Sequence, residues 1–174
     1  MTKDKLVLGA AGKGHPDAVT LDVSTRHKPD VVHDLDVFPW PFEDGRFGEI
    51  VCHHVIEHLS GLTPALRELH RICRPGGRIT IEVPHFSSWM ANDPEHKMRF
   101  SYFALDPYFL GHRKNWLLVD FSFDLLERRL TFHRAFRRYF FHRLWNRCPL
   151  AYERFWTYLM PAEHLIFVLS PVKT

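Results

Sequence analysis

The sequence predicts an α/β fold built on a mostly parallel sheet, with an antiparallel edge strand and helices on both faces. Five short runs rich in Val, Ile and Leu lie in the first half of the chain. Such runs are typical of strands that are buried on both faces. A clear amphipathic helix separates the last two of these runs, as crossovers between parallel strands require. Two further strand-like runs near the end of the sequence can form an antiparallel pair at one edge.

Length and composition indicate one domain over residues 1–174 and exclude several classes of protein. A chain of 174 residues with 45% hydrophobic and 25% charged residues can bury a core and is not disordered. No apolar run approaches the ~20 residues that would span a bilayer, and no apolar signal segment follows the N-terminus. Three cysteines at irregular spacing exclude a disulfide framework. We therefore expect a cytoplasmic protein.

The expected elements follow one another at short intervals. A helix is predicted from the three- and four-residue spacing of Leu62, Leu66 and Leu69, with Pro75-Gly76-Gly77 ending it. Only residues 9–18 separate the first two strands, so this crossover is expected to be a loop or a single turn. The predicted strands are residues 5–8, 19–22, 30–34, 49–52, 78–83, 121–125 and 164–170.

Two segments depart from this alternation. Residues 85–116 contain aromatic residues, histidines and prolines with weak periodicity, which predicts an irregular insertion or lid. Residues 134–145 contain arginines interleaved with aromatic residues and are predicted to form a basic, aromatic, amphipathic helix.

The residues that follow the predicted strands are candidates for binding, because ligands of open parallel sheets bind at the carboxyl ends of the strands. Gly9 and Ala10 follow the first strand and allow a ligand close to the backbone. Asp22 ends the second strand, where its carboxylate can accept both hydrogen bonds of a ribose diol. The third strand ends in Asp34 and Leu35, an acceptor beside an apolar wall that would suit adenine. The fourth strand ends in His53 and His54.

In these residues the sequence resembles the class I, Rossmann-like methyltransferases that use S-adenosylmethionine, and in particular their short type-11-like members. The resemblance covers residues 5–100, and residues 161–173 resemble the closing strand of that family. It implies S-adenosylmethionine as cofactor, with Gly9, Ala10, Asp22, Asp34, Leu35, His53 and His54 as donor contacts. The matching segments are Leu6-Val7-Leu8-Gly9, Leu21-Asp22-Val23-Ser24, Asp30-Val-Val-His-Asp-Leu35, residues 38–47, His54-Val-Ile-Glu-His-Leu59 and residues 66–78.

For methyl transfer to a hydroxyl, a general base is needed near the acceptor. The candidates lie in the predicted insertion and are His85, Asp93 and His96. An alternative is that these side chains only cap turns of a loop. A second alternative, from another class, is a catalytically silent module that keeps the fold, because Ala10-Ala11 replaces the usual glycine pair of the family.

A third hypothesis is a zinc-dependent hydrolase. His54-Val-Ile-Glu57-His58 matches the H-x-x-E-H pattern in which two histidines one helical turn apart bind zinc. The motif directly follows a strand and no third ligand helix is evident downstream, so the sequence predicts no metal site.

The distribution of charge suggests possible partners. Residues 128–147 contain seven arginines and no acid, interleaved with Phe, Tyr and Trp. This segment could lie on an anionic membrane surface, bind an acidic acceptor such as a phosphorylated sugar, or RNA, or cover the sheet or a second subunit of a homodimer. The net charge of +3 is too small to predict specific nucleic-acid binding. The expected acceptor is a small molecule or a glycan- or lipid-linked compound.

Overall fold

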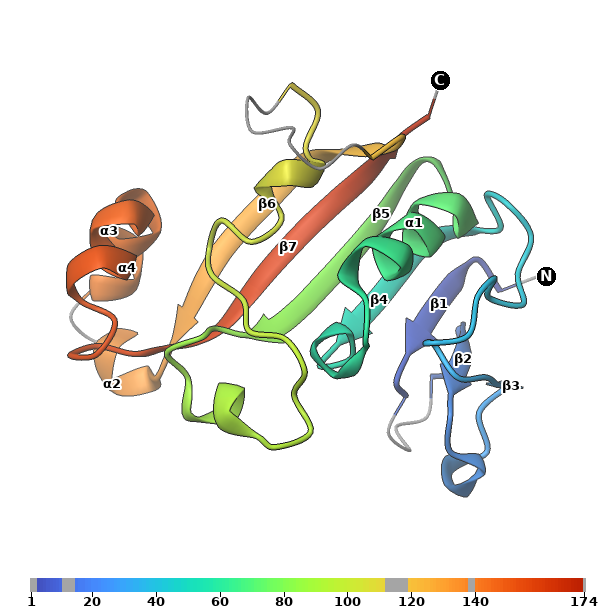
Figure 1. Cartoon of the computed structure of the whole chain (residues 1–174), viewed down its shortest axis with the longest axis horizontal. Coiled ribbons are helices and arrows are strands. Elements are labelled where there is room, and N and C mark those ends of the chain that lie inside the picture. Colours follow the sequence, from blue (N-terminus) through green and yellow to red (C-terminus); the bar gives the residue numbers. More distant parts are fainter. Residues whose placement is uncertain (1–2, 11–14, 112–118, 138–139, 174) are drawn as a thin grey trace.

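The computed structural model describes residues 3–10, 15–111, 119–137 and 140–173. Its centre is a seven-stranded sheet in the order β3-β2-β1-β4-β5-β7-β6 (Figure 1). The strands are β1 Lys5–Leu8, β2 Ala18–Asp22, β3 Val31–Val32, β4 Phe47–His53, β5 Cys73–Pro84, β6 Ser122–Phe132 and β7 Ala162–Val172. The helices are α1 Leu62–Ile72, α2 Arg134–Arg137, α3 Phe141–Arg147 and α4 Pro149–Phe155.

The pairing of the strands confirms the predicted mostly parallel sheet. Strands β1 to β5 pair in parallel, and β7 pairs antiparallel with both β5 and β6. The antiparallel strand therefore lies one position inside the edge, and β6 forms the edge itself. Both late strands are longer than the sequence predicted, because β6 and β7 pair over nearly their whole length.

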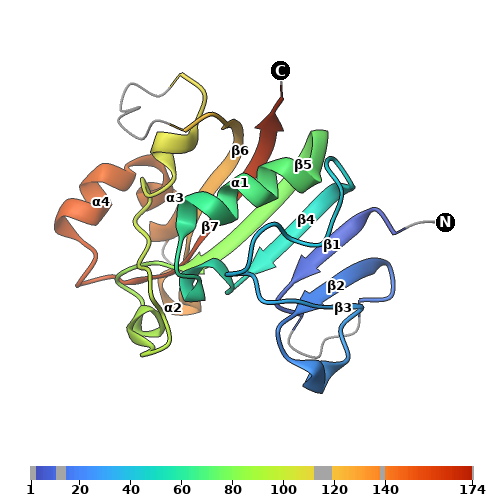
Figure 2. The same ribbon diagram turned by 45° about the vertical axis from the view of Figure 1, so that its right-hand side comes forward.

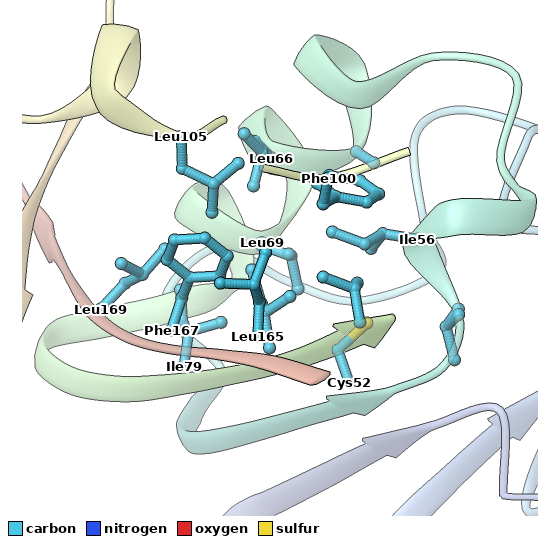
Figure 3. Packing of buried hydrophobic residues seen from close by; sticks show 14 of the residues in the cluster. Cys52, Ile56, Leu66, Leu69, Ile79, Phe100, Leu105, Leu165, Phe167 and Leu169 are labelled. Atoms are coloured by element: carbon cyan, nitrogen blue, oxygen red, sulfur yellow. The ribbon is translucent and has the colours of Figure 1, made fainter. Parts of the chain in front are cut away.

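Helix α1 forms because its apolar residues recur on one face, and it packs that face on the sheet. Leu66 and Leu69 are fully buried and point toward Ile79, Leu165 and Phe167 of the central strands (Figure 3). Burying each such leucine contributes about 1.5–3 kcal/mol. The predicted helix is confirmed, but it ends at Ile72, before the predicted stop at Pro75-Gly76-Gly77, because the chain turns at Cys73 directly into β5.

The opposite face of the parallel strands is open in the described ranges. Glu49, Thr80 and Glu82 point away from α1, and they line a broad hollow of about 720 Å³. The sequence predicted helices on both faces, whereas among the described residues the helix on the parallel strands is α1 (Figure 1). The short β1–β2 crossover leaves little chain for a second layer; its residues 11–14 lie outside the described ranges.

The segment after β5 has two different parts, and both include a short 3-10 helix. Residues 86–97 form a loop that contains η3, Trp89–Asn92, and is largely exposed apart from the buried Ser88 and Ala91. Residues 100–109, which contain η4 Asp106–Tyr108, are part of the core, since Phe100 and Leu105 are buried against α1 (Figure 3). Among the described residues of the predicted insertion, the lid therefore stays a prediction for residues 86–97. Residues 112–116 of the predicted insertion lie outside the described part.

The predicted single helix over residues 134–145 is wrong, because the structure has two short helices there. Helices α2 and α3 lie beside the β6 edge together with α4 (Figure 2). Phe140 has φ 59°, which an α-helix cannot include, so a new helix begins after it. Residues 138–139 lie outside the described ranges. Within the described residues, no helix has the length and apolar character needed to cross a membrane.

Candidate functional site

A cavity of about 500 Å³ lies at the carboxyl ends of β1, β2 and β4. Its size is within the range of small-molecule and cofactor sites. Five residues predicted from the sequence line it, namely Gly9, Asp22, Asp34, Leu35 and His54. We call it the donor cavity. The contact of these residues with a donor remains a prediction.

Gly9 turns the chain at the end of β1. Its φ is +63°, a left-handed conformation that glycine adopts without strain. Its N–H donates to the carbonyl of Leu21 at 2.9 Å, which fixes the turn against β2. A Cβ at this position would lie 2.5 Å from Cγ2 of Val55, so only glycine fits beside the cavity wall.

Two carboxylates face the cavity from the next two strand ends. Asp22 Oδ1 accepts a hydrogen bond from the backbone N–H of Ser24 at 2.9 Å, and Asp34 Oδ1 accepts from that of Asp36 at 2.9 Å. Each aspartate therefore also caps a local turn. A carboxylate has two oxygens and about four lone-pair sites, so capping leaves acceptor capacity for a ligand.

The far wall of the cavity is tied together by Asp36, Ser60 and Lys97. Asp36 accepts hydrogen bonds from the backbone N–H and the hydroxyl of Ser60, both at 2.8 Å, and from Lys97 Nζ at 3.2 Å. The hydrogen bond from the Ser60 backbone, more than any other contact, lowers the pKa of the Asp36 carboxyl. This network joins three separate segments of the chain at the wall of the cavity.

His54 lies at the junction of three hollows. Its backbone is left-handed, with φ 54°, and its ring lines the donor cavity, a neighbouring cavity of about 350 Å³ and the open face of the sheet. Its Nδ1 lies 3.2 Å from Oε1 of the buried Glu57. Its ring also meets that of His164 edge-on at 4.9 Å. Such backbone strain in a non-glycine residue is frequent at functional sites.

Ala10 and His53 lie elsewhere than predicted. Both line the hollow on the open face of the sheet and neither lines the donor cavity. His53 is the last residue of β4, whereas the left-handed backbone of His54 turns the chain, so that His54 lines both the donor cavity and the open-face hollow. His53 is 54% exposed and lies 4.0 Å from Glu82.

The prediction of His85 as an acceptor base needs correction. Its side chain is fully buried, with Nε2 3.1 Å from Glu153 Oε1 and Nδ1 2.7 Å from Ser87 Oγ. Glu153 also accepts from the backbone N–H of Tyr102. His85 thus joins the end of β5 to α4 and to the core segment, and it reaches none of the cavities described here.

Asp93 and His96, the other two predicted bases, do line a cavity. They form the neighbouring 350 Å³ cavity with His54, Met90 and the 81% exposed Trp89. Asp93 Oδ1 accepts from the backbone N–H of Glu95 at 2.9 Å, as the turn-capping alternative expects. We call this the acceptor cavity, because it shares His54 with the donor cavity. The roles of Asp93 and His96 in catalysis remain predictions.

Sequence reasoning missed several residues of the donor cavity. Val23, His33, Asp36 and Lys97 line it. Asp36 and His33 could have been found from their spacing around Asp34 at the same strand end. No sequence pattern points to Lys97, which reaches the site from the loop after β5.

The geometry of the H-x-x-E-H match excludes the zinc-peptidase interpretation. His54 is left-handed and η2, Ile56–His58, is a single 3-10 turn, so His54 and His58 do not lie one turn apart on an α-helix. The rings of His54 and His58 instead contact different histidines. His54 meets His164, and His58 meets His96.

Comparison with known proteins shows what part of the chain is similar to. Residues 15–81 match the family model of a methyltransferase domain of the type-11 kind. This match and the similar folds support a class I methyltransferase of the type-11 kind. Superposition on the SAM-dependent methyltransferase from Archaeoglobus fulgidus covers 95% of this chain and 85% of that one, with a TM-score of 0.52 and 15% identity. The methyltransferase-like fold extends well beyond the matched segment.

Two further similar proteins are informative. Haemonchus contortus phosphoethanolamine N-methyltransferase 2, solved with S-adenosyl-L-methionine, is similar over 95% of this chain and 48% of that chain, with a TM-score of 0.53 and 12% identity. An uncharacterized 37.1 kDa protein in transposon TN4556 of Streptomyces fradiae is 30% identical over 79 residues. That match covers 45% of this chain and 23% of the relative.

S-adenosylmethionine is the cofactor of this methyltransferase family, and the donor cavity fits it. Gly9 leaves the backbone accessible, Asp22 and Asp34 provide acceptors, and Leu35 with Val55 provides apolar walls. The aspartates suit the hydroxyl and amine groups of the cofactor, and the apolar walls suit its aromatic base.

Proposed function

We propose that this protein transfers a methyl group from S-adenosylmethionine to a small molecule or to a glycan- or lipid-linked acceptor. The observation that carries the proposal is the position of His54 between the donor and acceptor cavities. Two cavities that share one side chain can hold two reactants next to each other, and alignment of reactants is a large part of catalysis.

The roles follow from the lining of each cavity. The cofactor supplies an activated methyl group on a sulfonium. Asp22 and Asp34 would hold the donor by its hydroxyl and amine groups. Asp93 and His96 are the candidates that receive the proton of an acceptor hydroxyl. Trp89 offers an exposed apolar surface on which a sugar ring or an acyl chain can pack.

Calorimetry with S-adenosylhomocysteine tests the donor site directly. A working donor cavity binds this product, and mass spectrometry of the purified protein should detect a co-purified adenosyl ligand. A folded protein that binds neither would support the catalytically silent module instead.

We also propose that residues 128–147, with the adjoining α4, contact an anionic membrane. Arg137, Arg143 and Arg147 are exposed beside Phe140 and Leu144, which are 61% and 47% exposed. Exposed aromatic residues next to arginines are typical of interfacial segments. Arg128 does not share this role, because it is mostly buried against Asp106 and stacks on Tyr102.

Sedimentation with vesicles tests this contact. Vesicles rich in anionic lipid should co-sediment the protein at low salt and release it at high salt. Phe140→Ser with Leu144→Ser should co-sediment less than the parent protein at low salt. A second copy of the chain is the other occupant that this surface suits. A dimer in analytical ultracentrifugation that Phe140→Ser disrupts would favour that outcome.

A further inference from the structure

We propose that Glu57, His58 and His96 form a binding site for a divalent transition-metal ion, beside the donor cavity. Each residue offers one ligand atom, and these atoms lie within 4.8 Å of one another. Glu57 and His58 come from η2, and His96 comes from the loop after β5. The third ligand, His96, is therefore far in sequence from the H-x-x-E-H motif, and no sequence pattern connects the two.

The buried carboxylate of Glu57 is the strongest indication of a ligand. Its side chain is fully buried, and neither oxygen accepts a hydrogen bond from the described residues. Its one ion-pair neighbour there is Nδ1 of His54, 3.2 Å from Oε1. A buried carboxylate without hydrogen bonds is costly unless a cation compensates its charge.

The two histidines are arranged as metal ligands usually are. His58 Nδ1 lies 3.3 Å from the carbonyl oxygen of Glu95, which can only accept, so this nitrogen carries the hydrogen. That contact leaves Nε2 of His58 as the metal-binding atom, in the way that backbone carbonyls orient metal-bound histidines. Nδ1 of His96 is buried and has no hydrogen-bond partner in the described part of the chain. The two rings meet edge-on at 4.6 Å.

The backbone holds the three side chains together without any ion. The N–H groups of Lys97 and Met98 donate to the carbonyl of Glu57 at 2.8 and 3.1 Å. The loop that carries His96 is thus fixed directly on the turn that carries Glu57 and His58. A site that is already assembled loses little entropy when an ion binds.

The donor set indicates the class of ion. Two imidazole nitrogens and one carboxylate oxygen suit Zn²⁺ and neighbouring transition metals better than Mg²⁺ or Ca²⁺, which prefer oxygen ligands. Three protein ligands leave at least one coordination position open. A second group, His54, Glu82 and His164, has a similar spacing. It lacks the buried, unbonded carboxylate, and Nδ1 of His164 already lies 3.2 Å from the hydroxyl of Thr131.

An ion at this site would act on the acceptor, a step that rests on the proposed function. His58 lines the donor cavity and His96 lines the acceptor cavity, so the ion would lie between them. A metal at an open position lowers the pKa of a bound hydroxyl. The proton would then be lost to Asp93 or to water, and His96 would be a ligand in place of a base.

Zinc titration of the full chain tests the site without donor or acceptor. After treatment with a chelator, the protein should bind one equivalent of Zn²⁺ in calorimetry. Glu57→Gln, His58→Ala and His96→Ala should each weaken this binding by about 100-fold or more, since even indirect changes at metal sites cost ~10–100-fold. His164→Ala in the second group and His133→Ala, an exposed histidine, should keep it.

Two results would overturn the proposal. One is the absence of a stoichiometric Zn²⁺ site, and the other is a site that survives His96→Ala but is lost in His164→Ala. His96 lies in a loop, so His96→Ala should remain folded, and circular dichroism checks this for all variants. Binding of S-adenosylhomocysteine is measured separately, so failure of the metal site is distinguishable from failure of the proposed methyl transfer.

Discussion

The carboxylate of Asp22 accepts a 2.9 Å hydrogen bond from the backbone N–H of Ser24 while it lines the donor cavity. Asp22 can therefore act in two ways, as a ligand contact and as a turn cap. The position of its carboxylate allows both roles at once. A substitution that preserves the cap but removes the charge can therefore separate them.

Asp22→Asn should weaken binding of S-adenosylhomocysteine with little loss of stability. The amide oxygen of asparagine can still accept from Ser24, but the variant loses a charged acceptor for the ribose. Hydrogen bonds to charged groups contribute ~1.5–3 kcal/mol, so calorimetry should show binding weaker by roughly tenfold to 150-fold. Asp22→Ala should also lose the cap and about 1 kcal/mol of stability.

The outcome that contradicts this assignment is equally definite. If Asp22→Asn binds S-adenosylhomocysteine as the parent does, while Asp22→Ala only lowers the melting temperature, Asp22 is a cap and the donor site has been misplaced.

Gly9→Ala should impair both folding and donor binding. The new Cβ would meet Val55 Cγ2 at 2.5 Å in a left-handed backbone conformation. Overpacking and backbone strain each cost ~1–3 kcal/mol. Chemical denaturation should show a loss of about 2–4 kcal/mol, and calorimetry should show weak or no binding of S-adenosylhomocysteine.

Gly76→Ala is the matched control for this prediction. Gly76 also has a positive φ, 70°, but a Cβ at this position would have no atom within 4 Å among its described neighbours. The variant should lose about 1 kcal/mol from strain alone and keep full binding. Equal effects of the two substitutions on binding would show that Gly9 is not special to the cavity.

Much of the fold could be predicted from the sequence because local patterns determine it. Buried strands are short apolar runs, and α1 has its apolar face at helical spacing, so Leu66 and Leu69 could be placed in the core. The strand ends then located Asp22, Asp34 and His54, because parallel strands bring their carboxyl ends to one edge.

The rest depends on contacts between distant segments, which no local pattern encodes. Lys97 reaches Asp36 from another part of the chain, and His96 meets His58 in the same way. The sequence predicted a catalytic role for His85, but its buried ring contacts Glu153, which lies 68 residues later in the chain. The break of the helix at Phe140 likewise follows from a backbone conformation that aromatic residues rarely adopt.

Glu68→Ala should be strongly destabilising, because Glu68 joins α1 to the loop before β4. It is buried, and it accepts from the backbone N–H of Trp40 at 2.7 Å and from Arg71 at 2.7 and 2.8 Å. These hydrogen bonds raise the pKa of the Arg71 guanidinium. Arg71 is a quarter exposed, so the loss should be about 2–4 kcal/mol in chemical denaturation, somewhat below that of a fully buried pair.

Arg67→Ala on the same helix is the control for Glu68→Ala. Arg67 pairs with the exposed Asp120 at the surface, and such pairs contribute little. Similar losses of stability in the two variants would mean that the helix as a whole, and not the Glu68 network, had been disturbed.

The last prediction concerns the pH dependence of stability at His70. Burial, more than any other factor, lowers the pKa of this imidazole below its ordinary value of 6.5. Its Nε2–H donates to the carbonyl of Val172 at 2.9 Å, joining α1 to β7. Below about pH 6.5 the unfolded chain binds a proton at this residue that the folded chain does not bind, so protonation favours unfolding. The contribution of His70 is therefore fully present above about pH 7 and decreases as the pH falls toward the lowered pKa of the folded state.

Replacing the imidazole of His70 should make the free energy of unfolding depend less steeply on pH. Between pH 7.5 and pH 5.5, urea denaturation should show the parent losing up to ~1 kcal/mol more than His70→Phe, because the ring is half-buried and partly screened. His70→Phe also loses the hydrogen bond to Val172, so its stability should be lower at both pH values, and the informative quantity is the difference in slope. His133→Phe, at an exposed position, should keep the slope of the parent. If His70→Phe and His133→Phe give the same slope, His70 titrates normally in the folded protein and this linkage does not exist.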